Sequence, residues 1–317
     1  MNRFTELLDP ITRSFLEAGR AAGGPKIEEM SVPEARAAMR ASQPSRYTDY
    51  AVRTEEIPLE GYSLKTVRPQ NAAHSLPALV YFPGGGWVLG GSDTHARIVC
   101  ELALRVQCSV IVVDYARAPE SPYPAAKHQC ISALKYVHDH ASALNIDTER
   151  IAIAGDSAGG NLAAAVALEA AKRNISLRLQ ALICPVVDSD FDTPSYLDFG
   201  SNMNLDRSAM QWFWKHYVPS LERRKESGAS PLRASVDQIN NLAPAILVTA
   251  ECDVLRDEAE HYARKLANAG INVIAIRYLG AVHNFPVVDA LAATPNARAC
   301  LSMLATQLQL GLKKEAV

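Results

Sequence analysis

From about residue 76 onward, short apolar runs alternate with longer segments whose apolar positions recur at helical spacing. The runs are rich in β-branched residues, which is typical of strands buried on both faces of a parallel sheet. We therefore predict strands at residues 78–82, 109–114, 150–154, 179–185, 245–250 and 271–278.

Predicted helices lie between these strands, at residues 95–106, 124–140, 159–173 and 257–269, and another follows the last strand at 294–310. This alternation indicates an open sheet with helices on both faces. Two more polar runs, at 50–57 and 61–68, predict an antiparallel edge. The predicted fold class is α/β, with an eight-stranded, mostly parallel sheet.

Two segments do not follow the alternation. Residues 1–45 have a helical pattern rich in Ala and Arg, and residues 186–225 contain an amphipathic run at 208–218. We interpret both as additions to one α/β domain, which is formed by residues 46–185 and 226–317.

Composition excludes several classes of protein. The 317 residues include 32 Lys and Arg against 34 Asp and Glu, a net charge of −2, which gives no electrostatic basis for binding nucleic acid. No apolar stretch of about 18 residues predicts a membrane span. The six cysteines have neither disulfide-scaffold density nor zinc-ligand spacing, and the N-terminus lacks a secretory signal, so we expect a cytoplasmic protein without a bound metal.

The main chemical motif is Gly-Asp-Ser-Ala-Gly at residues 155–159. It follows a predicted strand and opens a predicted helix, which is the setting of a nucleophile elbow. In such a turn the serine has a strained backbone, and side chains at 155 or 159 would collide with the strand or the helix. The motif therefore predicts that Ser157 is a nucleophile.

A serine hydroxyl needs a base to accept its proton. In this fold the order along the chain is Ser, then Asp or Glu, then His. Of the histidines after Ser157, His216 lies in the amphipathic run and His261 in a predicted helix, whereas His283 follows the last predicted strand. Catalytic groups gather at the carboxyl ends of parallel strands, so we predict that His283 is the base.

The acid that orients this base is expected one strand earlier. Asp253 lies just beyond the predicted strand 245–250, and 30 residues separate it from His283, which leaves room for one helix and one strand. Glu251 and Asp257 are the alternatives, although Asp257 also suits a helix N-cap. We predict that Asp253 is the acid.

A glycine run, Pro-Gly-Gly-Gly-Trp at 83–87, directly follows the first buried strand. Acyl transfer develops a negative oxygen, and glycine lets backbone N–H groups approach it closely. The amide of Ala158, next to the nucleophile, is a further donor. Trp87, Trp212 and Asp156 are the candidates for substrate binding, although Asp156 also suits a role in ordering the elbow.

These motifs together resemble the hormone-sensitive-lipase family of carboxylesterases, within the α/β-hydrolase fold. The similar stretches are residues 81–87, 114–120, 155–160, 229–232, 251–258 and 283–285. The resemblance implies a triad of Ser157, Asp253 and His283. It also implies a helical cap made from residues 1–45 and 186–225, and an oxyanion hole formed by the amides of Gly84, Gly85 and Ala158, with Gly86 as a substitute for one glycine.

Two positions depart from the family pattern. Pro83 stands where the family has a histidine that helps to order the glycine loop, and Asn284 stands where glycine is more common. Proline fixes its own φ near −65°, which offers another way to stiffen the loop. Because the oxyanion donors are backbone amides, we expect hydrolysis to survive with altered efficiency or selectivity.

The predicted function is hydrolysis of short- to medium-chain carboxylic esters by a serine carboxylesterase. The expected partner is a small uncharged ester, with no cofactor, metal, nucleic acid or membrane, and the resemblance suggests a homodimer. One alternative is an amidase or arylformamidase with the same triad. The other is a non-catalytic small-molecule binding protein of the same fold.

Overall fold

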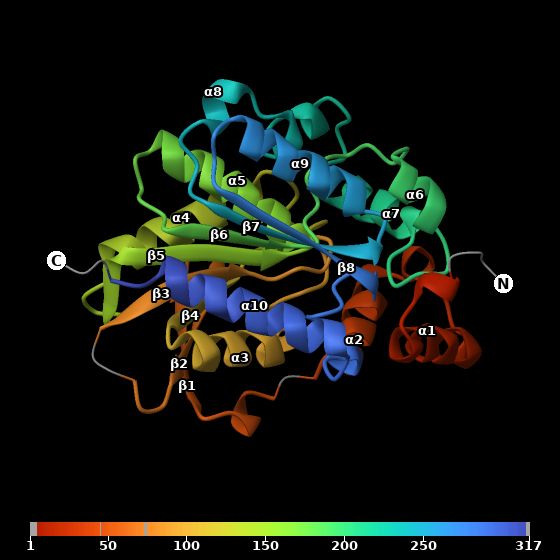
Figure 1. Ribbon diagram of the computed structural model, residues 1–317, viewed down its shortest axis with the longest axis horizontal. Coiled ribbons are helices and arrows are strands. Elements are labelled where there is room, and N and C mark those ends of the chain that lie inside the picture. The colour runs from red at the N-terminus through yellow and green to blue at the C-terminus, as the bar shows by residue number, and fades with distance from the viewer. Residues whose placement is uncertain (1–4, 45, 73–74, 315–317) are drawn as a thin grey trace.

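The computed structural model describes residues 5–44, 46–72 and 75–314. Residues 1–4, 45, 73–74 and 315–317, which the predicted segments include, lie outside this description. One sheet of eight strands forms the centre of the molecule (Figure 1). The strands are β1 (Val52–Leu59), β2 (Tyr62–Pro69), β3 (Leu76–Phe82), β4 (Ser109–Asp114), β5 (Ile146–Asp156), β6 (Leu179–Ile183), β7 (Ala245–Cys252) and β8 (Val273–Val282).

The strand order is β1-β2-β4-β3-β5-β6-β7-β8. β2 pairs antiparallel with both β1 and β4, and every other neighbouring pair is parallel. The predicted eight-stranded, mostly parallel sheet with an antiparallel edge is therefore confirmed. β8 continues four residues beyond its predicted end, so the strand delivers the chain directly to His283.

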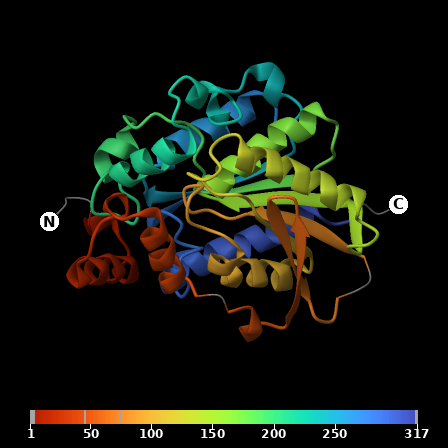
Figure 2. The same ribbon diagram turned by 180° about the vertical axis from the view of Figure 1, so that it is seen from behind.

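Helices cover both faces of the sheet (Figures 1 and 2). One face carries α3 (Ala96–Val106) and α10 (Pro295–Gly311), and the opposite face carries α4 (Ala125–Asp139), α5 (Ala158–Lys172) and α9 (Arg256–Asn268). The remaining α-helices are α1 (Pro10–Ala22), α2 (Val32–Ser42), α6 (Pro194–Phe199), α7 (Arg207–Tyr217) and α8 (Val236–Ile239). Short 3₁₀-helices include η2 (Ile27–Glu29) and η4 (Ser92–Thr94).

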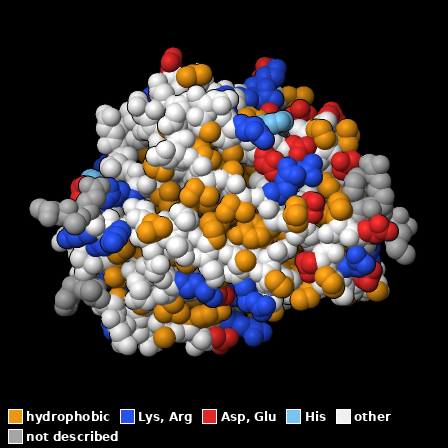
Figure 3. Space-filling view, in the orientation of Figure 1, with side chains coloured by type: hydrophobic (Ala, Val, Ile, Leu, Met, Phe, Trp, Pro, Cys, Tyr) orange, Lys and Arg blue, Asp and Glu red, His pale blue; other side chains and the backbone are white. Residues whose placement is uncertain are grey.

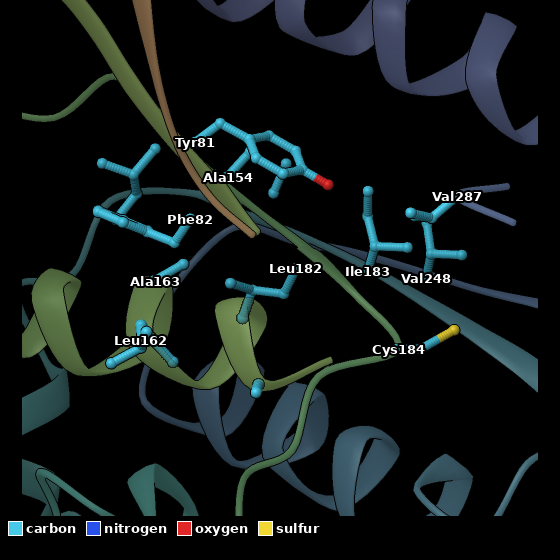
Figure 4. Packing of buried hydrophobic residues seen from close by; sticks show 14 of the residues in the cluster. Tyr81, Phe82, Ala154, Leu162, Ala163, Leu182, Ile183, Cys184, Val248 and Val287 are labelled. Atoms are coloured by element: carbon cyan, nitrogen blue, oxygen red, sulfur yellow. The ribbon is translucent and has the colours of Figure 1, made fainter. Parts of the chain in front are cut away.

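The core lies between the sheet and these helices. All seven residues of β3 are buried, as are the five of β6. Figure 4 shows Phe82 and Leu182 of the sheet beside Leu162 and Ala163 of α5. Each large side chain buried in this way contributes about 1.5–3 kcal/mol of transfer free energy, so the sheet holds its strand ends rigidly in place.

The two segments that sequence analysis set apart lie at one end of the molecule. Helices α1 and α2 of the first and α6 and α7 of the second are gathered where the carboxyl ends of the parallel strands lie (Figures 1 and 2). An ion pair between Lys26 and Asp206, 2.9 Å long, joins the two segments. They cover the edge of the sheet at which Ser157 and His283 leave their strands.

The surface carries charges of both signs. On the face shown in Figure 3, Lys and Arg side chains lie among Asp and Glu side chains. None of the helices in the described part of the chain combines the length and the apolar character that crossing a membrane requires. All six cysteines are buried with free thiols, so they behave as small core residues.

Candidate active site

Ser157 lies in a sharp turn between β5 and α5. Its φ of 54° and ψ of −121° form a strained conformation for a residue with a side chain. A Cβ at Gly155 would lie 2.2 Å from the carbonyl oxygen of Gly159, and one at Gly159 would lie 1.9 Å from that of Phe82. Glycine is therefore required at both positions, as the motif predicts.

Three buried side chains form a hydrogen-bonded chain at the carboxyl ends of the strands. His283 Nε2 lies 3.0 Å from Ser157 Oγ, and His283 Nδ1 lies 2.8 Å from Asp253 Oδ2. These side chains come from the ends of β8, β5 and β7. A base between a hydroxyl and an orienting carboxylate is the arrangement that activates a serine.

The carboxylate of Asp253 is held in place by its own loop. Its Oδ1 accepts a hydrogen bond from the amide of Leu255 at 3.0 Å, which leaves Oδ2 for His283. The two alternative acids are engaged elsewhere: Glu251 accepts from the Gly280 amide, and Asp257 accepts from the Ser195 amide. Of the three acids, the geometry favours Asp253.

The amide of Gly84 does not face the site. It donates to Asp156 Oδ1 at 3.0 Å, so its N–H is already used within the protein. Gly85 and Gly86 line the cavity in front of Ser157, whereas Gly84 does not. This geometry departs from the predicted oxyanion donors Gly84, Gly85 and Ala158, and it favours Gly86 as the substitute.

Asp156 is fully buried beneath the site, so it does not contact substrate as sequence analysis proposed. Its Oδ1 accepts from the Tyr81 hydroxyl at 2.8 Å as well as from Gly84, and its Oδ2 accepts from Asn284 Nδ2 at 2.7 Å. Its role is therefore to order the elbow and the glycine loop, which was the second role suggested for it.

His95, which sequence reasoning missed, completes this network. Its Nδ1 lies 3.1 Å from the carbonyl oxygen of Gly91, and its Nε2 lies 3.2 Å from Asp156 Oδ1. The Gly84 amide also lies 3.2 Å from Nε2, and Thr94 Oγ1 lies 2.9 Å from Nδ1, so both ring nitrogens are held by hydrogen-bonding groups. Burial acts to lower the pKa of His95, but the Asp156 carboxylate outweighs it and the pKa is raised. Conversely, His95 holds the pKa of Asp156 below its usual value despite burial.

The backbone of Pro83 is held in place by another residue, although the proline side chain itself forms no hydrogen bonds. Its carbonyl oxygen accepts a hydrogen bond from the Tyr115 hydroxyl at 2.6 Å. The carbonyl of Val88, just beyond the glycine loop, accepts from Arg36 Nε of α2 at 2.8 Å. The loop is thus ordered by side chains from other elements.

A cavity of about 560 Å³ opens in front of Ser157. Both covering segments, the glycine loop and the loop of His283 line it, mostly with apolar side chains such as those of Met30, Met39, Leu89, Leu205, Phe213 and Val287. The two tryptophans predicted to bind substrate are not among the lining residues. Trp87 is buried against Tyr217, with ring centroids 4.2 Å apart, and Trp212 packs against Phe213 and His216. Phe15 and Phe213 are the phenylalanines that line the cavity.

One group of side chains in the described part of the chain could approach a metal ion. The ligand atoms of Cys184, Asp253 and His283 lie within 4.8 Å of one another. However, burial raises the pKa of the Cys184 thiol, which keeps it protonated, and His283 Nδ1 is already bonded to Asp253. This group therefore suits proton transfer better than metal binding.

The sheet, the elbow and the Ser–His–Asp arrangement define the class of α/β hydrolases. A family model described as the alpha/beta hydrolase fold matches residues 79–287. An ethyl acetate hydrolase from Pseudomonas putida is 35% identical over 299 residues, covering 88% of this chain and 92% of that protein. A carboxylesterase from Mycobacterium tuberculosis, NlhH, is 33% identical over 305 residues, covering 92% and 93%.

Solved structures agree with these relatives. A thermostable esterase from Pseudomonas putida ECU1011 is 39% identical and superposes with a TM-score of 0.93, over 97% of this chain and 98% of that one. A fungal esterase from Rhizomucor miehei is 36% identical with a TM-score of 0.89, over 96% of each chain. The chain belongs to the hormone-sensitive-lipase-like carboxylesterases of the α/β-hydrolase fold.

Proposed function

We propose that this protein hydrolyses short- to medium-chain carboxylic esters by two-step acyl transfer from Ser157. The observation that carries the proposal is the hydrogen-bonded chain from Ser157 through His283 to Asp253 at the base of an apolar cavity. His283 takes the Ser157 proton as the hydroxyl oxygen attacks the ester carbonyl, and Asp253 holds the imidazole in the required tautomer.

In the same step the carbonyl π electrons move to oxygen, and a tetrahedral oxyanion forms. Collapse of this intermediate expels the alcohol, which receives the proton from His283, and leaves an acyl group on Ser157. Water then attacks the acyl-enzyme with His283 again as the base, and release of the acid restores the hydroxyl.

The oxyanion donors in this proposal are the amides of Gly85, Gly86 and Ala158. Gly85 and Gly86 line the cavity, and Ala158 is the first residue of α5, where the amides have no partner within the helix. The amide of Gly84 is committed to Asp156, so it acts on the oxyanion only by orienting the loop.

The covering segments set the substrate class. Residues 5–44 and 186–225 act as a cap over the cavity, because both contribute lining residues and the Lys26–Asp206 ion pair joins them. The lining is largely apolar, which suits an uncharged acyl chain. A cavity of about 560 Å³ beneath this cap suits a small ester better than a large triglyceride.

The direct test measures hydrolysis of p-nitrophenyl acetate and butyrate by Ser157→Ala, with the exposed Ser142→Ala as the matched control. We expect Ser157→Ala to fold normally and to lose activity by at least about 10⁴-fold, while Ser142→Ala behaves as wild type. Full activity in Ser157→Ala would overturn the proposal. Inactivity of the wild type towards every ester would favour the non-catalytic alternative.

The amidase alternative is tested by comparing an ester with its matched anilide. The esterase proposal predicts a much larger kcat/KM for the ester, because the better leaving group needs less help from the general acid. A larger kcat/KM for the anilide would assign the protein to the amidases.

A further inference from the structure

Asn284 follows the candidate base directly, lines the cavity and contacts Asp156 with its side chain. Its φ of 53° is in the left-handed region, where asparagine is tolerated better than most residues. From there its Nδ2 donates a hydrogen bond of 2.7 Å to Asp156 Oδ2. Two residues 128 positions apart, each next in sequence to a candidate catalytic residue, are thus joined.

The orientation of this amide is determined by its partner. The carboxylate of Asp156 is ionised in the folded protein and only accepts hydrogen bonds, so the group facing it is Nδ2. Oδ1 then points elsewhere, and it is buried with no hydrogen-bond partner among the described residues. Asparagine therefore keeps one strong hydrogen bond at the expense of leaving one buried polar atom unpaired.

The backbone conformation does not explain asparagine at this position. A glycine would adopt the positive φ without strain and would bury no unpaired oxygen. The contact with Asp156 is the one favourable polar interaction that the Asn284 side chain makes within the described residues. The role of Asn284 therefore depends on what Asp156 contacts.

Asp156 connects Asn284 to the glycine loop. Its other oxygen, Oδ1, accepts from the amide of Gly84, and Gly84 has no side chain of its own with which to anchor the loop. When Gly84 N–H points down to Asp156, the following residues Gly85 and Gly86 are presented to the cavity. One carboxylate thus joins the loop of the base to the loop of the oxyanion donors.

We propose that Asn284 is a positioning residue that couples the His283 loop to the glycine loop through Asp156. This proposal rests on the function proposed above and deepens it. Without the Asn284 amide, Asp156 keeps its bond to Gly84 but no longer holds the His283 loop. The nucleophile, base and oxyanion donors then adopt their joint geometry in a smaller fraction of molecules, which lowers the rate of acylation.

The first test is Asn284→Gly, which removes the amide and suits the backbone at this position. The matched control is Asn174→Gly, because Asn174 has a φ of 56° and lies exposed beyond the far end of α5. For p-nitrophenyl butyrate we expect kcat to fall about 10- to 100-fold, the loss expected for a hydrogen bond to a charged group. KM should change much less, and the control should match wild type.

The second test is Asn284→Asp, which has almost the same shape but places a carboxyl group beside Asp156. The groups that face this position are Tyr81, His95, Asp156, Cys184 and His283. Two adjacent carboxyl groups share a proton, so the new carboxyl donates to Asp156 only while it stays protonated. The kcat of Asn284→Asp relative to wild type should therefore be highest near pH 5.5 and should decline towards pH 9.

The outcomes separate the two proposals. Wild-type hydrolysis that depends on Ser157, together with unchanged kcat in Asn284→Gly, would overturn the coupling role and leave the proposed function standing. An Asn284→Asp to wild-type ratio that is constant with pH would also count against it. A wild type without esterase activity would overturn the proposed function itself. A fall in kcat that is confined to the two Asn284 variants and depends on pH in Asn284→Asp would establish the coupling.

Discussion

The Phe213 ring of α7 lies directly against Gly86, so a Cβ added to that glycine would be 2.0 Å from Phe213 Cδ1. Gly86 belongs to the glycine loop, and Phe213 belongs to the segment that covers the site. The cap and the loop that carries the proposed oxyanion donors are therefore in van der Waals contact. A change in either one is transmitted to the other, because packed interiors have little free volume.

This contact predicts the effect of Gly86→Ala. The added methyl group collides with the Phe213 ring and also requires an alanine at φ 60°, so the loop must move and its amide leaves the oxyanion. We expect kcat/KM for p-nitrophenyl acetate to fall at least about 100-fold, the usual effect of losing one oxyanion donor. Steady-state kinetics of the purified variant measure this.

The control is Gly19→Ala in α1, where an added Cβ meets nothing within 4 Å. A second substitution, Phe213→Ala, removes the ring and should recover part of the lost activity in the Gly86→Ala background. If Gly86→Ala retains wild-type kcat/KM, Gly86 is not an oxyanion donor and the packing argument is wrong.

A second prediction concerns Arg36, which docks α2 onto the domain. Its guanidinium donates one hydrogen bond to the carbonyl oxygen of Val88. It donates two more to the carboxylate of Glu120, and the bonding to Arg36 lowers the pKa of Glu120 to about 2. Glu120 is 61% exposed, so solvent screening limits the ion pair to under about 1 kcal/mol of stability. The bond to Val88 orders the glycine loop. For Arg36→Ala we therefore expect a small loss in Tm but a fall of about tenfold in kcat/KM.

The control for this prediction is Arg40→Ala, because Arg40 is an exposed arginine on the same helix. Thermal unfolding and ester hydrolysis are measured on both variants and on the wild type. Equal kinetic effects at positions 36 and 40 would show that α2 does not act on the site through Val88.

Sequence patterns were sufficient for the framework of this protein and for proposing three side chains that the structure brings together. Alternating apolar runs identify strands that are buried on both faces, and the glycines around Ser157 are required by close backbone contacts. Because β5, β7 and β8 are parallel, the residues that follow them meet at one edge of the sheet. That is why Ser157, Asp253 and His283 could be selected from many serines, acids and histidines.

The orientation of individual groups could not be predicted in the same way. Trp87 follows the glycine loop in sequence, but its φ of 60° turns the ring towards Tyr217 and away from the cavity. The Gly84 amide points to Asp156 Oδ1, and the residue type of Gly84 does not reveal this direction. His95 joins the network through a turn at Gly91–Thr94, and the sequence carries no motif that marks it. The cytoplasmic location and the homodimer stay predictions.

The last prediction concerns Glu258, a buried acid of α9 near the site. Its Oε1 accepts hydrogen bonds from the amides of Val187 and Asp188, where the chain leaves β6. Burial raises the pKa of Glu258 well above its usual value, so the folded protein holds a proton that the unfolded chain releases near pH 4.3. Stability therefore falls as the pH rises from the unfolded pKa towards the folded one.

Glu258→Gln keeps the acceptor and has no proton to lose. At pH 8 its Tm should exceed that of the wild type by about 2 °C or more, and the gap should close near pH 4.5. The exposed Glu17→Gln is the control, and a Tm difference for Glu258→Gln that is the same at both pH values would show that Glu258 is not protonated in the folded protein.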